Sequence, residues 1–127
     1  MTAFFKKSAL MPESSLAPLR GEIWLLDFDP TRGHEQAGTR PALVLSADRF
    51  NSGPANLVIV CPLSSKNRSI RSHVEVEPPD GGLAVTSYVM TEHIRSVSRD
   101  RLVRRLGALS TERVEAIEER LRILIRL

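Results

Sequence analysis

This sequence has little of what builds disulfides, membrane spans or stacking surfaces. Its 127 residues include one cysteine, Cys61, so no disulfide can form within the chain, which fits a reducing compartment such as the cytoplasm. No apolar run is long enough to predict a membrane span. One Trp, one Tyr and four Phe leave few rings for stacking on a ligand. Cysteine, histidine and carboxylate residues show no metal-ligand spacing, so we expect no metal and no other cofactor.

What is present is the composition of one globular domain. Hydrophobic residues make up 42% and charged residues 26%, and 127 residues suffice for a real core. Residues 1–18 show neither helical nor strand periodicity, so we expect a flexible tail before a single domain over residues 19–127. Cys61 lies in the apolar run VIVCPL, which favours a buried core residue over a catalytic thiol.

Short apolar or alternating runs, separated by Gly, Pro, Asn and Ser, predict strands along most of the chain. The predicted strands cover residues 20–28, 41–46, 56–64, 72–77, 86–97 (broken near residues 92–93) and 103–109, with one helical turn at 99–102. Pro62 predicts a bulge or an edge. Because these strands do not alternate with helices, a parallel doubly wound sheet is disfavoured. The pattern predicts a mainly β fold: a small, bent antiparallel sheet or barrel with one terminal helix.

The terminal helix is predicted from its cap and its periodicity. Ser110 can cap it, and Glu112 would lie in the positively polarised first turn. Aliphatic residues recur at helical spacing, and charged residues fill the other face. The aliphatic positions are Val114, Ile117, Leu121, Leu124 and Ile125. We expect them to pack in the core rather than to form a stripe that binds a partner.

Positive charge gathers in the second half of the chain, and the net charge is +3. Lys66, Arg68 and Arg71 have no acidic neighbour. A second group surrounds Asp100: Arg95, Arg99, Arg101, Arg104 and Arg105. Two such patches are consistent with a polyanionic partner such as nucleic acid, because guanidinium forks bind phosphate bidentately. A solvated face would carry the same charges, so charge alone leaves both interpretations open.

The stretch at residues 31–40, TRGHEQAGTR, is polar and lies between two predicted strands. It has no large apolar residue, so it contributes little to a core. Long loops of this kind are often functional, although a floppy hairpin loop fits the same composition.

The flanks of this loop decide between those alternatives. RGEIW at 20–24, DFDPTRGHEQAGTRPALVLS at 27–46 and VIVCPLSSK at 58–66 resemble the MazF/PemK family of toxin endoribonucleases, and the likeness continues to residue 127. The resemblance implies an SH3-like antiparallel barrel with a C-terminal helix that forms a homodimer. It implies sequence-specific, metal-independent cleavage of single-stranded RNA through attack by the 2′-hydroxyl. It also implies a cognate antitoxin whose extended C-terminal segment blocks the RNA groove.

The resemblance also assigns site residues. Arg40, before the proline, matches a catalytic arginine, and Ser64 stands where the family has a threonine. Glu35 is the candidate base, with His34 as a second candidate that departs from the family's serine. His93 departs from a glutamine. The expected RNA-binding residues are Arg32, His34, Gln36, Lys66, Arg68, His93 and Arg95.

Alternatives remain at this stage. CcdB toxins share the fold but bind a protein and cut nothing, and a degenerate member would bind only antitoxin or RNA. Arg40 could pair with Asp27 or Asp29 and only pin the loop. We expect His73 on the surface and Phe50 as the one ring near the groove.

Overall fold

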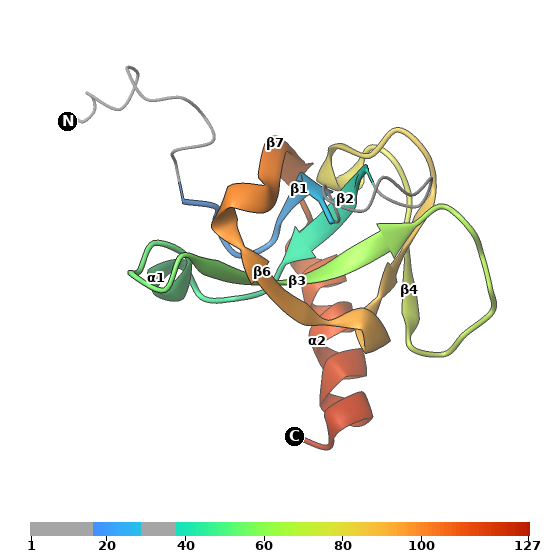
Figure 1. The fold of residues 1–127 in the computed structure, drawn as a ribbon. Coiled ribbons are helices and arrows are strands. Elements are labelled where there is room, and N and C mark those ends of the chain that lie inside the picture. The colour runs from blue at the N-terminus through green and yellow to red at the C-terminus, as the bar shows by residue number, and fades with distance from the viewer. Residues whose placement is uncertain (1–16, 29–37) are drawn as a thin grey trace.

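The chain folds into one antiparallel sheet with a long helix at its C-terminal end (Figure 1). This computed structural model describes residues 17–28 and 38–127. The strands are β1 (Glu22–Asp27), β2 (Thr39–Val44), β3 (Leu57–Ser64), β4 (His73–Val76), β5 (Ser87–Met90), β6 (Arg95–Ser98) and β7 (Leu102–Ala108). The helices are α1 (Asp48–Asn51), α2 (Thr111–Ile125) and the 3-10 turns η3 (Asp80–Gly82), η4 (Thr91–His93) and η5 (Arg99–Arg101). The mainly β prediction with a terminal helix is confirmed.

Every strand pair is antiparallel, and β3 is the hub of the sheet. The order is β4-β5-β3-β2-β1-β7, with β6 pairing β3 off this path. The first half of β3 pairs with β6 as far as Val60, and its end pairs with β5 from Leu63. Pro62, where an irregularity was expected, lies at this change of partner. Strand pairing among the described residues does not close the barrel.

The polar stretch ends sooner than predicted. β2 starts at Thr39 rather than Pro41, because Thr39 and Arg40 already pair with Asp27 and Leu26 of β1. Arg40 therefore stands on a strand, which fixes its backbone as a loop would not.

Strand β1 is covered on both faces. Ile23 packs into one core cluster with residues of β3, β4 and α2, whereas Trp24 and Leu26 pack into a second with β6 and β7. Cys61 is fully buried in the first cluster, so the predicted core role is confirmed. Two arginines of the positively charged group around Asp100 fasten this strand. Arg101 donates to the carbonyls of Asp27 and Phe28, and Arg105 pairs with Glu22 at 2.8 Å.

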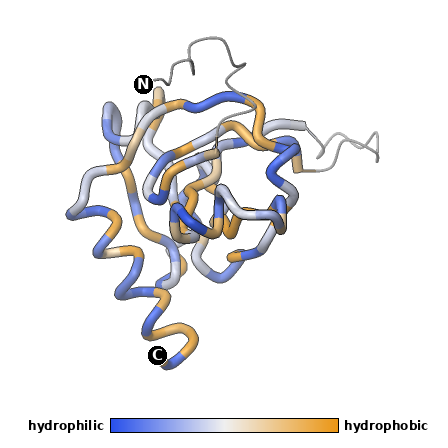
Figure 2. Tube along the Cα trace, turned by 90° about the vertical axis from the view of Figure 1, so that its left-hand side faces the viewer, coloured by the Kyte–Doolittle hydropathy of each residue, from blue (hydrophilic) through white to orange (hydrophobic). Residues whose placement is uncertain are grey.

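Helix α2 is capped as predicted, because the Ser110 hydroxyl accepts a 3.3 Å hydrogen bond from the Arg113 amide. Its first half is also packed as predicted, with Ile117 fully buried. The prediction is wrong at Leu124 and Ile125, which are 43% and 51% exposed. The helix runs on past the body of the molecule, so its last turn has no sheet beneath it (Figures 1 and 2). No helix in the described part of the chain is long and apolar enough to cross a membrane.

Candidate functional site

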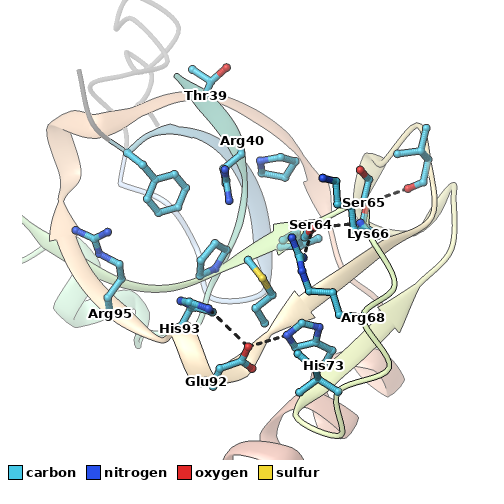
Figure 3. A pocket seen from close by; sticks show the side chains of 18 residues that line it. Thr39, Arg40, Ser64, Ser65, Lys66, Arg68, His73, Glu92, His93 and Arg95 are labelled. Atoms are coloured by element: carbon cyan, nitrogen blue, oxygen red, sulfur yellow. Dashed lines mark hydrogen bonds and ion pairs between the residues drawn. The ribbon is translucent and has the colours of Figure 1, made fainter. Parts of the chain in front are cut away.

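A polar pocket of about 860 Å³ opens beside the end of β3, bordered by β2, β5, η4 and β6 (Figure 3). It gathers residues that are far apart in the sequence. Its lining comprises Phe28, Thr39, Arg40, Pro41, Pro62, Leu63, Ser64, Ser65, Lys66, Arg68, Ile70, His73, Val85, Ser87, Met90, Glu92, His93 and Arg95. Four of these side chains are cationic at neutral pH, which makes the pocket suited to an anion.

Arg40 projects from β2 into this pocket (Figure 3). The residue is exposed, and it forms no ion pair with Asp27, one of the two partners considered above. Its neighbour in the pairing with β1 is the apolar Leu26. A guanidinium on a paired strand, facing a solvent-filled pocket, can receive a phosphate without first breaking a contact to that carboxylate.

Ser64 is the last residue of β3, and two donors hold its hydroxyl oxygen. The backbone amide of Lys66 and the Nη1 of Arg68 each donate to Ser64 Oγ at 3.1 Å. A hydroxyl oxygen has two lone pairs, so both acceptor positions are occupied. The hydroxyl proton finds no acceptor among the described residues, so Ser64 is set up to donate to a ligand.

Glu92 lies at the foot of the pocket with a donor on each carboxylate oxygen. Oε1 accepts a 2.5 Å hydrogen bond from the Ser72 hydroxyl, and Oε2 lies 2.7 Å from His73 Nε2. Burial pushes the pKa of Glu92 upward, but these hydrogen bonds outweigh it and the net pKa is lowered from 4.5. The carboxylate is therefore ionised at neutral pH.

The imidazole of His73 is almost fully enclosed, with 4% of its side chain exposed, so the prediction of a surface residue is wrong. The reason is that η4 folds over the end of β4 and brings Glu92 onto the ring. Its Nδ1 is buried and has no partner among the residues that the structure describes. An ionised carboxylate can only accept, so Nε2 carries the proton of this hydrogen bond and donates it to Glu92.

The other side of the pocket mouth carries His93, Arg95 and Phe28. His93 is exposed, with its Nε2 3.7 Å from Glu92 Oε2. The guanidinium carbon of Arg95 lies 5.7 Å from the centroid of the Phe28 ring, which is cation–π range. The ring at this pocket is thus Phe28, and Phe50, which was expected here, belongs to α1 and does not line it.

Comparison with known proteins identifies the family of the fold. Residues 19–125 match the family described as PemK-like, MazF-like toxins of type II toxin–antitoxin systems. The chain belongs to this family.

Individual relatives agree with that assignment. The chain is 35% identical over 109 residues to endoribonuclease MazF9 of Mycobacterium tuberculosis, covering 82% of this chain and 92% of the relative. The crystal structure of MazF from Deinococcus radiodurans is 31% identical with a TM-score of 0.74, over 88% of this chain and 99% of that chain. An endoribonuclease solved with its cognate antitoxin, from a mycobacterial species, is 27% identical with a TM-score of 0.73, over 87% and 97%.

The structure brings six of the predicted site residues of this family member into one pocket. They are Arg40, Ser64, Lys66, Arg68, His93 and Arg95. Arg32, His34, Glu35 and Gln36 lie outside the described residues. Among the residues that are described, no group of histidines, cysteines and carboxylates could hold a metal ion.

Three pocket residues were missed from the sequence, namely Phe28, His73 and Glu92. Phe28 directly follows β1 and precedes the polar stretch, and that position in the sequence was a usable signal. The pairing of His73 with Glu92 gave no usable signal in the sequence, because it depends on how η4 turns between β5 and β6.

Cys61 lies beneath the site, and burial followed by the negative charge of Glu92 raises its pKa to about 12. The thiol stays protonated at neutral pH, so it cannot serve as a nucleophile.

Proposed function

We propose that this chain is the toxin of a type II toxin–antitoxin system and acts in the cytoplasm as a sequence-specific endoribonuclease on single-stranded RNA, with mRNA as its target. The observation that carries the proposal is that one cationic pocket holds both Arg40 and a Ser64 hydroxyl whose two lone pairs are already taken, so that it can only donate. Those two groups suit the charge of a phosphate that is being cleaved.

RNA supplies its own nucleophile for this reaction. The 2′-oxygen forms a bond to the adjacent phosphorus, and the bond from phosphorus to the 5′-oxygen of the next nucleotide breaks. The 2′-hydroxyl loses its proton to a base, and the leaving 5′-oxygen gains one. The products are a 2′,3′-cyclic phosphate and a 5′-hydroxyl. The chain must align the sugar with the phosphate and stabilise the charge that grows on the phosphorane oxygens.

Arg40 and Ser64 divide the stabilisation of that charge. The guanidinium of Arg40 stays protonated and can donate two parallel N–H groups to two phosphate oxygens. Ser64 adds one O–H donor, held in direction by Lys66 and Arg68, whose amide and guanidinium occupy its lone pairs. Lys66 and Arg68 also place two positive charges where the backbone of the RNA leaves the site.

We assign the removal of the 2′-proton to Glu35, with His34 as the second candidate. RNA binding also involves Arg32, His34 and Gln36 from the same stretch of sequence, and His93 and Arg95 of the pocket. Sequence is read from unstacked bases by hydrogen bonds more than by stacking, because Phe28 is the one Phe, Tyr or Trp among the described lining residues.

Two partners follow from the proposed toxin role. One is an antitoxin, whose extended C-terminal segment would lie over the pocket; relatives have been solved with an antitoxin, including MazE-MazF from Deinococcus radiodurans. The other is a second copy of this chain. The apolar last turn of α2, with Ile123 and Ile125 65% and 51% exposed, supports a homodimer through that helix.

The deciding experiment is incubation of the purified protein with a long unstructured RNA, followed by mapping of the fragment ends. Discrete fragments with 5′-hydroxyl and cyclic phosphate ends, formed equally well with EDTA, are expected. Intact RNA would instead favour a CcdB-like toxin that acts on a protein, or a chain that only binds. Loss of cleavage on chelation would contradict the metal-independent mechanism.

A further inference from the structure

Glu92 is an unexpected charge for a pocket that binds RNA. It is the one carboxylate among the described lining residues, against Arg40, Lys66, Arg68 and Arg95. A negative charge repels phosphate, so its presence weakens binding of the RNA backbone. Its role in this pocket must therefore be something other than binding the RNA backbone.

The carboxylate is also held in one orientation, unlike a solvated surface side chain. Ser72 donates to Oε1 at 2.5 Å, and His73 donates to Oε2 at 2.7 Å from a ring that is 4% exposed. Two donors, one on each oxygen, fix both the position and the plane of the group. A carboxylate has about four acceptor positions, so about two remain free, and 31% of the side chain is exposed to the pocket.

A fixed, ionised carboxylate of this kind is a good acceptor of hydrogen bonds and a poor acceptor of protons. The hydrogen bonds that hold it lower its pKa, which moves it away from the range in which a general base works at neutral pH. Proton removal is therefore the weaker assignment. Recognition of N–H groups on a base is the stronger one.

We propose that Glu92 is a specificity-determining residue, which reads a base carrying an amino group on its Watson–Crick edge, with Ser72 and His73 as its positioning residues. This inference rests on the proposed ribonuclease function.

The chemistry of the bases sets the preference. Carboxylates accept hydrogen bonds from exocyclic amino groups such as cytosine N4. Guanine is the best fit, because its N1–H and N2–H donors lie side by side and can reach both oxygens. Uracil is the worst, because its single N3–H lies between two carbonyl oxygens that the carboxylate repels. The expected signature is one position of the cleavage motif at which an amino-bearing base is preferred over uracil.

The test compares the wild type with Glu92→Gln, which keeps the shape but loses the charge and one acceptor. Cleavage rates are measured on short RNAs that differ only at that position, with the preferred base, its analogue without the amino group, or uracil. The wild type is expected to favour the amino-bearing base by about tenfold or more. In Glu92→Gln this ratio is expected to fall to near one while cleavage continues. Glu119→Gln, an exposed change on α2, is the matched control and keeps the ratio.

Each other outcome overturns the inference. A wild type that shows no amino preference at any position, or a Glu92→Gln variant that keeps the ratio, leaves Glu92 without a reading role. A folded Glu92→Gln variant that cuts no RNA makes the residue part of the chemistry instead. If Glu92→Gln does not fold, Glu92→Asp takes its place. This variant keeps the charge but draws it back from the base, and the same fall in the cleavage ratio is expected. A wild type that cuts nothing contradicts the ribonuclease function itself, and this inference with it.

Discussion

Arg68 and Ser64 are joined by a 3.1 Å hydrogen bond in which the guanidinium donates to the hydroxyl oxygen. The Lys66 amide takes the other lone pair, also at 3.1 Å. With both lone pairs taken, the hydroxyl can only donate a hydrogen bond, and the two donors fix the direction of its O–H bond. The Ser64 oxygen is therefore oriented by hydrogen bonds alone, and the methyl group of a threonine would not be needed for that.

Changes at Ser64 test this account directly. We expect Ser64→Ala to lower the cleavage rate by about a hundredfold, because one donor to the developing charge is lost. Ser64→Thr keeps the oxygen and should stay within a few-fold of the wild type. Both rates are measured on one short RNA under single-turnover conditions. Equal losses in the two variants would show that the hydroxyl is not the active feature.

The charge at Arg40 is the second point to test. Arg40→Ala should lower cleavage by about a thousandfold or more, since both the charge and the bidentate fork are removed. Arg40→Lys keeps the charge without the bidentate fork, so its cleavage rate should lie between those of the wild type and Arg40→Ala. The residue is exposed, so thermal unfolding monitored by circular dichroism should change little in either variant. Undiminished cleavage by Arg40→Ala would remove it from the mechanism.

Two glycines with positive φ make a matched pair for stability. A Cβ on Gly82 (φ +74°) would lie 2.1 Å from the Leu106 carbonyl oxygen, where η3 presses on β7. A Cβ on Gly21 (φ +92°) would meet only Val114, at 3.8 Å. We expect Gly82→Ala to lower the free energy of unfolding by about 3 kcal/mol or more. Gly21→Ala should lower it by about 1 kcal/mol, from backbone strain alone. Denaturation in urea measures both, and similar values would contradict the close contact of η3 with β7.

Much of the fold was predictable because the signals are local. The strand runs, the break near Glu92 and the cap at Ser110 each depend on a few neighbouring residues, and the structure has them within a few residues of the predicted bounds. The last turn of α2 was not predictable in this way. Its aliphatic spacing continues unchanged after Leu121, and nothing local shows that the sheet beneath it has ended.

Site residues with a local sequence signal could likewise be predicted, and those that depend on packing could not. Arg40 and Ser64, which the structure brings to one pocket, could be named from the sequence because the motif around each is contiguous. His73 was misplaced because alternation along β4 puts it on the polar face, and only the fold shows that η4 covers that face with Glu92. A polar residue beside a polar residue of a distant element gives no periodic signal. Such pairs are visible only after the elements are packed.

The lowered pKa of Glu92 makes a prediction about acid stability. A carboxyl whose folded-state pKa lies below its ordinary 4.5 stabilises the fold above that pH, and this contribution is lost as pH falls through the folded-state value. Melting temperatures of the wild type and Glu92→Gln should therefore differ at pH 7 and converge below pH 4.5 as the contribution disappears. His73 and His93, which both face this carboxylate, are present in both proteins. Glu119→Gln, on the exposed side of α2, should follow the wild type at every pH.

The exposed end of α2 gives the last prediction. If a second copy covers it, Ile123→Glu should place a charge in the interface and leave the protein monomeric at concentrations where the wild type is a dimer. The monomer itself should lose little stability, because Ile123 is 65% exposed. Sedimentation or light scattering across a concentration series measures the change. Val103→Glu, at a residue of β7 that is 49% exposed, is the matched control and should leave the dimer intact. A dimer that survives Ile123→Glu but not Val103→Glu would move the interface from the helix to the sheet edge.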